Sequence, residues 1–462
     1  MDRNRGGSRV SNNERSLELE EIALKPLVKP GLGYNIGLAS LAVVVAVGVL
    51  FYAGQLWKGL SVTGMQNQVF WGLYITTFVY FIGISLAGTL VSAILRLSGQ
   101  HWQSPVSRIA EVITGSALIG ALLMVVIDMG RPERLLNIFI HGRIQSPLLW
   151  DVIAVNTYLF GSLLYLYIPM IPDLALCRDK LGESVSPIRQ KIYRLLALGW
   201  QNTPEQKERL EKVIGIMSVV IIPAGIAVHS VTAWIFGMTL RSGWDTTILA
   251  PYFVVSAFFS GVAMVIVAMA IFRKAFGLEK YLTVDHFKKL GWLLIAMGLV
   301  YGYFNFAELL TEAYKVKGHE LEFLSMFFTG RFSMLFWLFF LDCILLPVFL
   351  MVWPTTRNIT GITIAGVLVV IGVWFKRYIF VIPTLSLANT PTYFDSAPYR
   401  ASLPELSITM IGLAGFALLI ALFFRFFPAI PVWEIANEWD KESAEISSIN
   451  SVRLGKFKGG AK

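Results

Sequence analysis

The feature that most constrains this chain is a succession of about ten stretches that each hold roughly twenty predominantly apolar residues. A stretch of that length crosses the hydrocarbon core of a bilayer as an α-helix, because lipid offers the backbone no hydrogen-bond partners and a helix satisfies its own groups. The sequence therefore predicts an all-α integral membrane protein with about ten transmembrane helices. The predicted spans are residues 36–56, 70–95, 108–127, 148–172, 212–237, 249–272, 289–312, 332–353, 359–381 and 405–427.

The composition agrees with this class. Of the 462 residues, 55% are hydrophobic and only 15% are charged, whereas a typical soluble domain is about 25% charged. A net charge of +9 in a soluble chain could indicate nucleic-acid binding, but here we attribute the basic residues to loops on the cytoplasmic side. The first ~35 residues are polar and of mixed charge, so we expect no cleavable signal peptide.

The distribution of basic residues predicts the orientation. If the N-terminus is cytoplasmic, most of the 39 lysines and arginines fall on cytoplasmic segments. Lys376 and Arg377 are then counted among the residues on the outer side. Basic loops stay in the cytoplasm, and an even number of spans returns the chain to its starting side. We therefore expect both termini to be cytoplasmic, with a partly helical cytoplasmic segment at 173–211 and an outer loop at 382–404.

Ionisable residues inside a membrane are costly, so each is a candidate for function. These residues are Glu111, Asp128, Asp151, His229, Glu308, Glu312 and Asp342. The outer half would collect Asp128, His141, Asp151, His229, Asp245 and Arg400, a set suited to the two oxygens and two protons of a quinol. The alternative, that Asp128, His141 and Arg400 merely cap helix ends in water, stays open. Glu111, Asp342 and the tyrosines Tyr158, Tyr165 and Tyr167 could line a proton path.

The residues that bind metals and haem are sparse. Only His229 among the histidines is clearly embedded, and Cys177 and Cys343 are too few for an iron–sulfur cluster. We expect this chain to bind no metal, haem or iron–sulfur cluster itself. If it does redox chemistry, its electrons must leave through a partner.

Four segments carry a resemblance to a known family. They read DMGRPERLLNIFIHGRIQSPLLWD (128–151), YIPMIPDLALCRD (167–179), PAGIAVHSVTAWIFG (223–237) and RSGWDTTILAPYFVVSAFFSG (241–261). Together they resemble the NrfD/PsrC family of quinone-interacting membrane subunits, over roughly residues 70–380. Members of that family have eight helices in two four-helix bundles, and this chain departs from the pattern by an extra helix at each end.

That departure resembles the enlarged NrfD-like subunits of Alternative Complex III, of the ActC type, with the ActF type as the alternative. The resemblance implies a quinol (menaquinol or ubiquinol) as substrate in a bacterial cytoplasmic membrane. It implies three kinds of partner: c-type haem subunits, an iron–sulfur subunit and a second NrfD-like subunit. It also implies these segments: tail 1–35, first helix 36–66, quinol-binding bundle 67–238, second bundle 239–382, outer loop and tenth helix 383–436, and tail 437–462.

The resemblance also implies roles for particular residues. We expect His141, Asp151 and His229 to react with quinol, and Trp234, Asp245 and Arg400 to bind it. Asp173 belongs to the matching region, but the topology places it at the cytoplasmic end, in proton uptake or structure. Asp128 and Arg131 match the family segment and could form an ion pair that fixes a helix end. The expected proton path comprises Glu111, Asp128, Glu308 and Asp342.

Two other functions fit the same sequence. One is a membrane anchor that delivers electrons from quinol to a molybdenum-type or nitrite reductase. The other is a secondary transporter, in which Pro223, Gly225 and Pro347 would mark broken helices, although they do not form an obvious inverted pair.

Overall fold

The computed structural model describes residues 12–239, 241–315, 318–387, 398–439 and 441. Ten helices in these residues are long and apolar enough to cross a membrane, which confirms the predicted all-α membrane class. Their bounds are α2 Leu32–Lys58, α3 Leu73–Ile84 (continued by η2 Thr89–Ile94 and α4 Leu95–Leu97), α5 Ser104–Asp128, α7 Pro147–Leu181, α9 Pro204–Gly237, α10 Leu249–Ala275, α11 Val284–Lys315, α13 Ser333–Phe340 (continued by η6 Leu341–Leu345 and α14 Leu346–Val352), α15 Ile359–Ser386 and α16 Leu403–Phe426.

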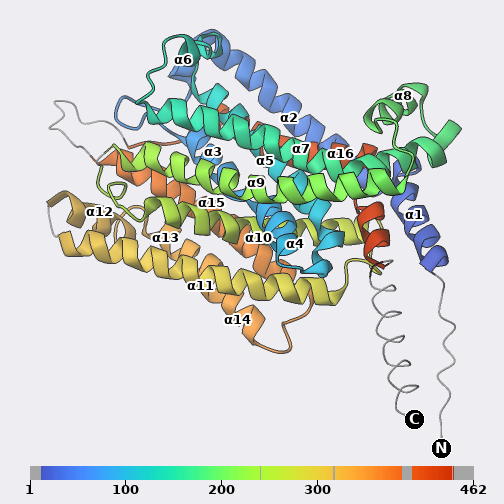
Figure 1. Ribbon diagram of the computed structural model, residues 1–462. Helices are drawn as coiled ribbons and strands as arrows, with labels where there is room; N and C mark the ends of the chain where they lie inside the picture. Colours follow the sequence, from blue (N-terminus) through green and yellow to red (C-terminus); the bar gives the residue numbers. More distant parts are fainter. Residues whose placement is uncertain (1–11, 240, 316–317, 388–397, 440, 442–462) are drawn as a thin grey trace, which may run out of the picture.

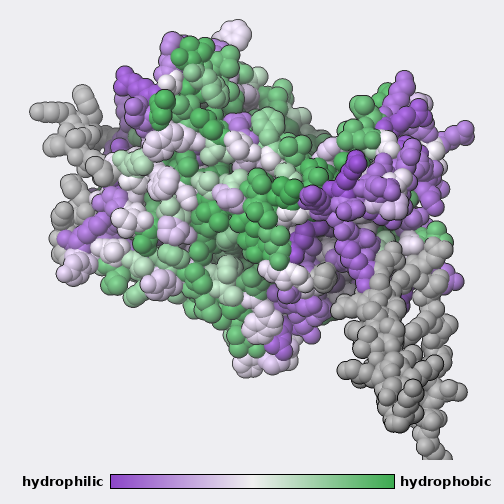
Figure 2. Space-filling view, in the orientation of Figure 1, coloured by the Kyte–Doolittle hydropathy of each residue, from purple (hydrophilic) through white to green (hydrophobic). Residues whose placement is uncertain are grey.

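The long helices run side by side, and short elements cover their two ends (Figure 1). One end carries α1 (Asn12–Val28), α8 (Pro187–Leu196) and a helix over residues 432–439, and we call it the terminal face. The other end carries α6 (Asn137–Ile140) and α12 (Gly318–Phe328), and we call it the far face. In Figure 2 apolar residues cover the middle of the molecule, and hydrophilic residues gather around α8 at the terminal face.

The helix contacts define two groups. Helices α3, α5, α7 and α9 contact one another in the first, and α10, α11, α13–α14 and α15 do so in the second. Helix α3 also contacts α10 and α15, so it lies between the groups. In the most apolar stretch of its span, 89% of the residues are buried inside the protein. Helix α2 packs on α16, and only 6% of the residues in its most apolar stretch are buried, as expected for a helix that faces lipid. Which group binds quinol stays a prediction, because packing does not identify a ligand.

Several helices extend beyond the predicted spans because polar turns continue them out of the apolar layer. Helix α9 begins at Pro204, eight residues before the predicted start, behind a capping box between Thr203 and Gln206. Helix α7 continues to Leu181 and α15 to Ser386. The placement of Lys376 and Arg377 outside was wrong, because both are buried within α15.

Candidate functional site

His229 occupies the interior of the first helix group. Its side chain is 1% exposed, and its Nδ1 and Nε2 lie 2.6 Å and 2.8 Å from the carbonyl oxygens of Gly225 and Ile82. A neutral imidazole has one N–H and satisfies one of these acceptors, whereas an imidazolium donates to both. The geometry therefore accommodates a ring that takes up and releases a proton. Tyr158 packs edge-on at 6.5 Å between ring centroids and donates to the carbonyl of Ser85 at 3.0 Å.

Asp151 lies in the first turns of α7, towards the far face. It is 7% exposed and accepts a hydrogen bond of 2.5 Å from the hydroxyl of Thr232 on α9. Thr232 stands one turn beyond His229 on the same helix, so the contact brings the carboxylate and the imidazole to adjacent levels of the α7–α9 pair. Both residues are polar groups in the apolar layer with specific partners, as expected for functional groups in a membrane.

The other predicted quinol residues do not converge on Asp151 and His229. His141 is exposed on the far face at the end of α6, and Trp234 is 44% exposed on α9. Arg400 is exposed before α16. Asp245 pairs with Lys315 of the second helix group at 3.0 Å. The structure thus brings together two members of the predicted set and disperses the rest over the far face.

Asp173 belongs to a buried ion pair near the terminal face. Its Oδ2 lies 2.6 Å from a guanidinium nitrogen of Arg108, and both side chains are 1% exposed. The chain beyond α16 completes this pair, because the N–H of Trp433 donates to Asp173 at 2.9 Å and the carbonyl of Ile430 accepts from Arg108 at 3.3 Å. These backbone partners satisfy the remaining hydrogen-bonding groups of the buried ion pair. They hold Asp173 near the terminal face, away from His229.

A line of hydroxyl groups starts beside this ion pair. Ser92 donates to the carboxylate of Glu111 in a short hydrogen bond and contacts the hydroxyl of Tyr165 at 3.2 Å. Tyr165 in turn contacts the hydroxyl of Ser218 at 3.0 Å. One turn farther along η2, Thr89 contacts the hydroxyl of Tyr158 at 2.7 Å. Polar groups thus occur at successive levels between Glu111 and the His229 level.

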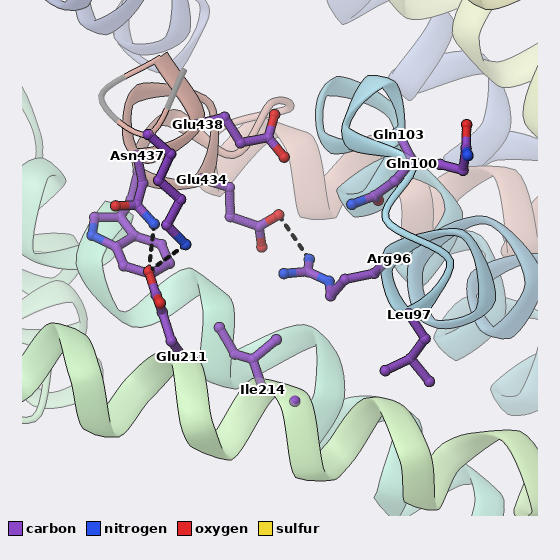
Figure 3. Close-up of a pocket in the computed structure, with 12 residues that line it drawn as sticks. Arg96, Leu97, Gln100, Gln103, Glu211, Ile214, Glu434, Asn437 and Glu438 are labelled. Atoms are coloured by element: carbon purple, nitrogen blue, oxygen red, sulfur yellow. Dashed lines mark hydrogen bonds and ion pairs between the residues drawn. The ribbon is translucent and has the colours of Figure 1, made fainter. Parts of the chain in front are cut away.

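A pocket of about 240 Å³ opens at the terminal face, where Arg96, Gln103 and Glu434 line it (Figure 3). Arg96 reaches across it to Glu434 at 2.8 Å, as the dashed line in Figure 3 marks. Sequence reasoning missed both residues. Arg96 follows the end of a predicted span, and Glu434 lies in a segment after the last span that carries no recognisable pattern.

The remaining predicted proton-path residues lie in separate places. Glu308 pairs with Lys376 at 3.2 Å inside the second helix group, with both side chains 9% exposed. Asp342 lies in η6 and is half-buried. Asp128 ends α5 at the far face, and its Oδ1 is buried without a partner. Among the described residues, no hydrogen-bonded line joins these three to Glu111.

Glu405 organises the far face and was also missed. It is fully buried and accepts from the N–H groups of Gly64 and Leu73 at 2.9 Å and 3.0 Å, and from the hydroxyl of Tyr399. Burial, followed by the charge of Glu405, raises the pKa of Tyr399 far above its usual range, so this hydroxyl stays a donor. The contacts fix the starts of α3 and α16 together.

Within the described residues, no group of three or more His, Cys, Asp or Glu side chains is placed to hold a metal ion. The described polar groups instead suit hydrogen bonding and proton exchange with an organic ligand.

Known proteins are similar to this chain over most of its length. The chain is 29% identical over 346 residues to a putative membrane subunit of the dimethyl sulfoxide reductase of Halobacterium salinarum, covering 73% of this chain and 74% of that protein. It is 26% identical over 401 residues to a subunit of the selenate reductase of Mesobacillus selenatarsenatis, covering 82% and 90%. It is 25% identical over 346 residues to the Hdr-like menaquinol oxidoreductase integral membrane subunit of Archaeoglobus fulgidus, covering 74% and 77%.

The family model described as polysulphide reductase, NrfD, matches residues 61–388, a range that contains Glu111, Asp151, His229 and both helix groups. The first span, α2, and the last, α16, lie mainly or wholly outside the matched range. This chain therefore belongs to the NrfD family of quinone-interacting membrane subunits of redox complexes.

Proposed function

We propose that this chain is the quinol-binding membrane subunit of a quinol-oxidising electron-transfer complex of the Alternative Complex III type. One observation carries the proposal: Asp151 and His229 are buried on the neighbouring helices α7 and α9, at adjacent levels in the half of the membrane towards the far face. The two extra spans, α2 and α16, match the enlargement that characterises those subunits.

In the proposed reaction, a quinol binds between these helices and the far face. Its two hydroxyl protons pass to Asp151 and His229, and its two electrons pass to an iron–sulfur cluster of a partner subunit, which leaves a quinone. Exposed His141, Trp234 and Arg400 would contact the quinol or the partner once the complex assembles. Asp245, which is paired with Lys315, would fix the border of the site.

The surface around His141 suits a partner. The short helix α6 and its flanks expose four large apolar side chains, each more than half exposed: Leu136, Phe139, Ile140 and Ile144. Contiguous exposed apolar residues at a membrane surface commonly mark a protein or lipid contact. We propose that the iron–sulfur subunit binds there, and that the complex also contains c-type haem subunits and a second NrfD-like protein.

We further propose that protons cross the first helix group along Glu111, Ser92, Tyr165 and Tyr158. Asp128 would serve at the far face, while Glu308 and Asp342 would act separately in the second group. In this orientation the terminal face is cytoplasmic and the complex resides in the bacterial cytoplasmic membrane.

A second function is favoured by the names of two relatives, which are subunits of dimethyl sulfoxide and selenate reductases. In that case the same site would oxidise quinol, but electrons would flow to a molybdenum-type reductase. The secondary transporter has no such support, because the three relatives compared above are named as subunits of redox complexes.

The first test is a reduced-minus-oxidised visible spectrum of the complex purified in mild detergent, before and after quinol is added. A c-haem spectrum that grows with quinol supports the Alternative Complex III type. Quinol oxidation by a preparation that contains molybdenum and lacks c-haem supports the reductase anchor. A chain that purifies alone and gives no redox signal contradicts both.

The second test is His229→Ala in the same preparation. Loss of a group that exchanges protons in the reaction lowers turnover about 100-fold or more, and the subunits should still copurify. The matched control is Ser230→Ala, because Ser230 is the next residue of α9 and bonds only to Ile226 of its own helix at 2.9 Å. If His229→Ala keeps turnover within twofold of the control, the proposed site is wrong.

A further inference from the structure

The pocket at the terminal face is enclosed partly by the chain that follows the last membrane span. Residues 432–439 form a short helix that lies across the ends of α4, α5 and α9. Glu434 and Glu438 from this helix face Arg96 and Gln103 across the pocket (Figure 3). Asn437 and Lys441 fasten it to α9 through Glu211, at 2.6 Å and 2.9 Å.

The pocket contains a polar group that requires a partner. Gln103 lines the pocket and is 3% exposed, yet its side-chain oxygen has no hydrogen-bond partner. A buried acceptor left unpaired destabilises the fold, and a volume of about 240 Å³ holds several water molecules. Water inside this pocket would satisfy the Gln103 oxygen and reach Arg96, whose Nε also lacks a partner.

Glu434 connects this pocket with the interior. It is 5% exposed and pairs with Arg96, and Arg96 stands one turn beyond Ser92, whose hydroxyl donates to the carboxylate of Glu111. Glu111 then leads through Ser92 to Tyr165 and Ser218. The partners of the two carboxyl groups, Arg96 and Ser92, thus stand one turn apart on the same helix, with Glu434 at the pocket and Glu111 on the hydroxyl line.

We propose that this pocket is the site of proton uptake on the terminal face, and that Glu434 takes a proton from pocket water and passes it to Glu111. The step moves one proton and no electron: Glu434 returns to its carboxylate form as Glu111 becomes protonated. Arg96 pairs with Glu434 and stands one turn from Ser92, the partner of Glu111, so its positive charge offsets a negative charge on either carboxyl group during the exchange. This inference rests on the proposed function for its source of energy, which is quinol oxidation.

The test uses the intact complex in vesicles, with a pH indicator on the terminal side and quinol plus the electron acceptor supplied. Wild-type complex should take up protons from that side during electron transfer. Glu434→Gln should reduce this uptake at least fivefold, and Glu111→Gln should do the same. Glu434→Asp, which keeps a carboxyl group, should restore at least half of the uptake.

The matched control is Glu208→Gln, which removes an exposed carboxylate of α9 that does not line the pocket. Uptake should stay within twofold of wild type in this variant. The inference is overturned if Glu434→Gln also keeps uptake within twofold, or if Glu434→Asp is as defective as Glu434→Gln, which would indicate a structural role. Quinol oxidation without any uptake from the terminal side overturns the inference alone, whereas a wild-type complex that does not oxidise quinol overturns the proposed function.

Discussion

At the scale of single residues, buried charged side chains between the membrane-spanning helices form ion pairs. Arg108 pairs with Asp173, and Lys376 pairs with Glu308, each pair almost fully removed from solvent. The two N–H groups of Arg377 without partners are an exception; its third nitrogen donates to Ser256 at 2.6 Å and its guanidinium lies over the ring of Phe253. A single buried charge is far more costly than a buried pair, so removal of one partner should be the most damaging change at this scale.

We expect Arg108→Met to destabilise the protein by about 3–5 kcal/mol, because it leaves the carboxylate of Asp173 buried without its counter-charge. The double variant Arg108→Met/Asp173→Leu should recover most of that loss, since both charges are then absent. The measurement is the free energy of unfolding in detergent. Lys289→Met provides the comparison: its pair with Asp285 is 42% and 64% exposed, so its loss should cost about 0–1 kcal/mol. Equal stability of Arg108→Met and Lys289→Met would contradict the argument.

The sequence identified Asp151, His229 and Glu111 as embedded polar groups, because an ionisable residue inside an apolar run can be recognised without a structure, and it placed Asp173 at the cytoplasmic end of its span. It could not identify their partners. Arg108 lies in α5 and Asp173 in α7, and which faces of two nearly all-apolar helices meet is not encoded in a hydrophobic period. Glu434 could not be identified from the sequence for a different reason. It lies outside every apolar run, and only the folded structure places it beside Arg96 at the terminal face.

At the scale of elements, α3 departs from regular α geometry at the level of the hydroxyl line. Residues Thr89–Ile94 form a π-helical turn, a feature that occurs frequently at functional sites. This turn carries Thr89 and Ser92, which contact Tyr158 and Tyr165 of α7. Predicted span 70–95 located the helix correctly, but no sequence signal distinguishes a π turn from the α-helix around it.

The close approach of α3 and α10 joins the two helix groups, and Gly261 permits it. A Cβ at Gly261 would stand 2.9 Å from the backbone N and Cα of Ala87, atoms that cannot move aside without shifting the chain between α3 and η2. We expect Gly261→Val to cost at least about 1–3 kcal/mol through overpacking, measured by thermal unfolding in detergent. Gly415→Ala in α16, where a Cβ meets nothing within 4 Å, should change little. Similar melting temperatures for the two variants would show that the two groups are not held by this contact.

At the scale of the whole molecule, the ten spans, and the common face of the segments that flank the first and last spans, were both predictable. The ten candidate spans match the ten apolar runs in order, and α1 and the helix over residues 432–439 lie at one face (Figure 1). The sequence did not predict that the chain after the last span covers the first helix group at this face. The chain after α16 supplies the backbone partners of Arg108 and Asp173, so a segment that looks like linker and tail in the sequence closes the first helix group.

The orientation of that face decides the direction of every proton movement proposed above, and cysteine labelling tests it. The native thiols of Cys177 and Cys343 are 1% exposed and should not react, so Arg194→Cys on α8 and Arg143→Cys beside α6 report the terminal and far faces separately; both positions are exposed. With a membrane-impermeant maleimide, we expect Arg143→Cys to react in intact spheroplasts, and Arg194→Cys to react only in inverted vesicles, because basic loops stay in the cytoplasm. The reverse pattern would place the pocket of Arg96 and Glu434 outside. Proton uptake through Glu434 would then begin outside, the quinol protons would leave on the cytoplasmic side, and the first helix group would move charge across the membrane opposite to the proposed direction.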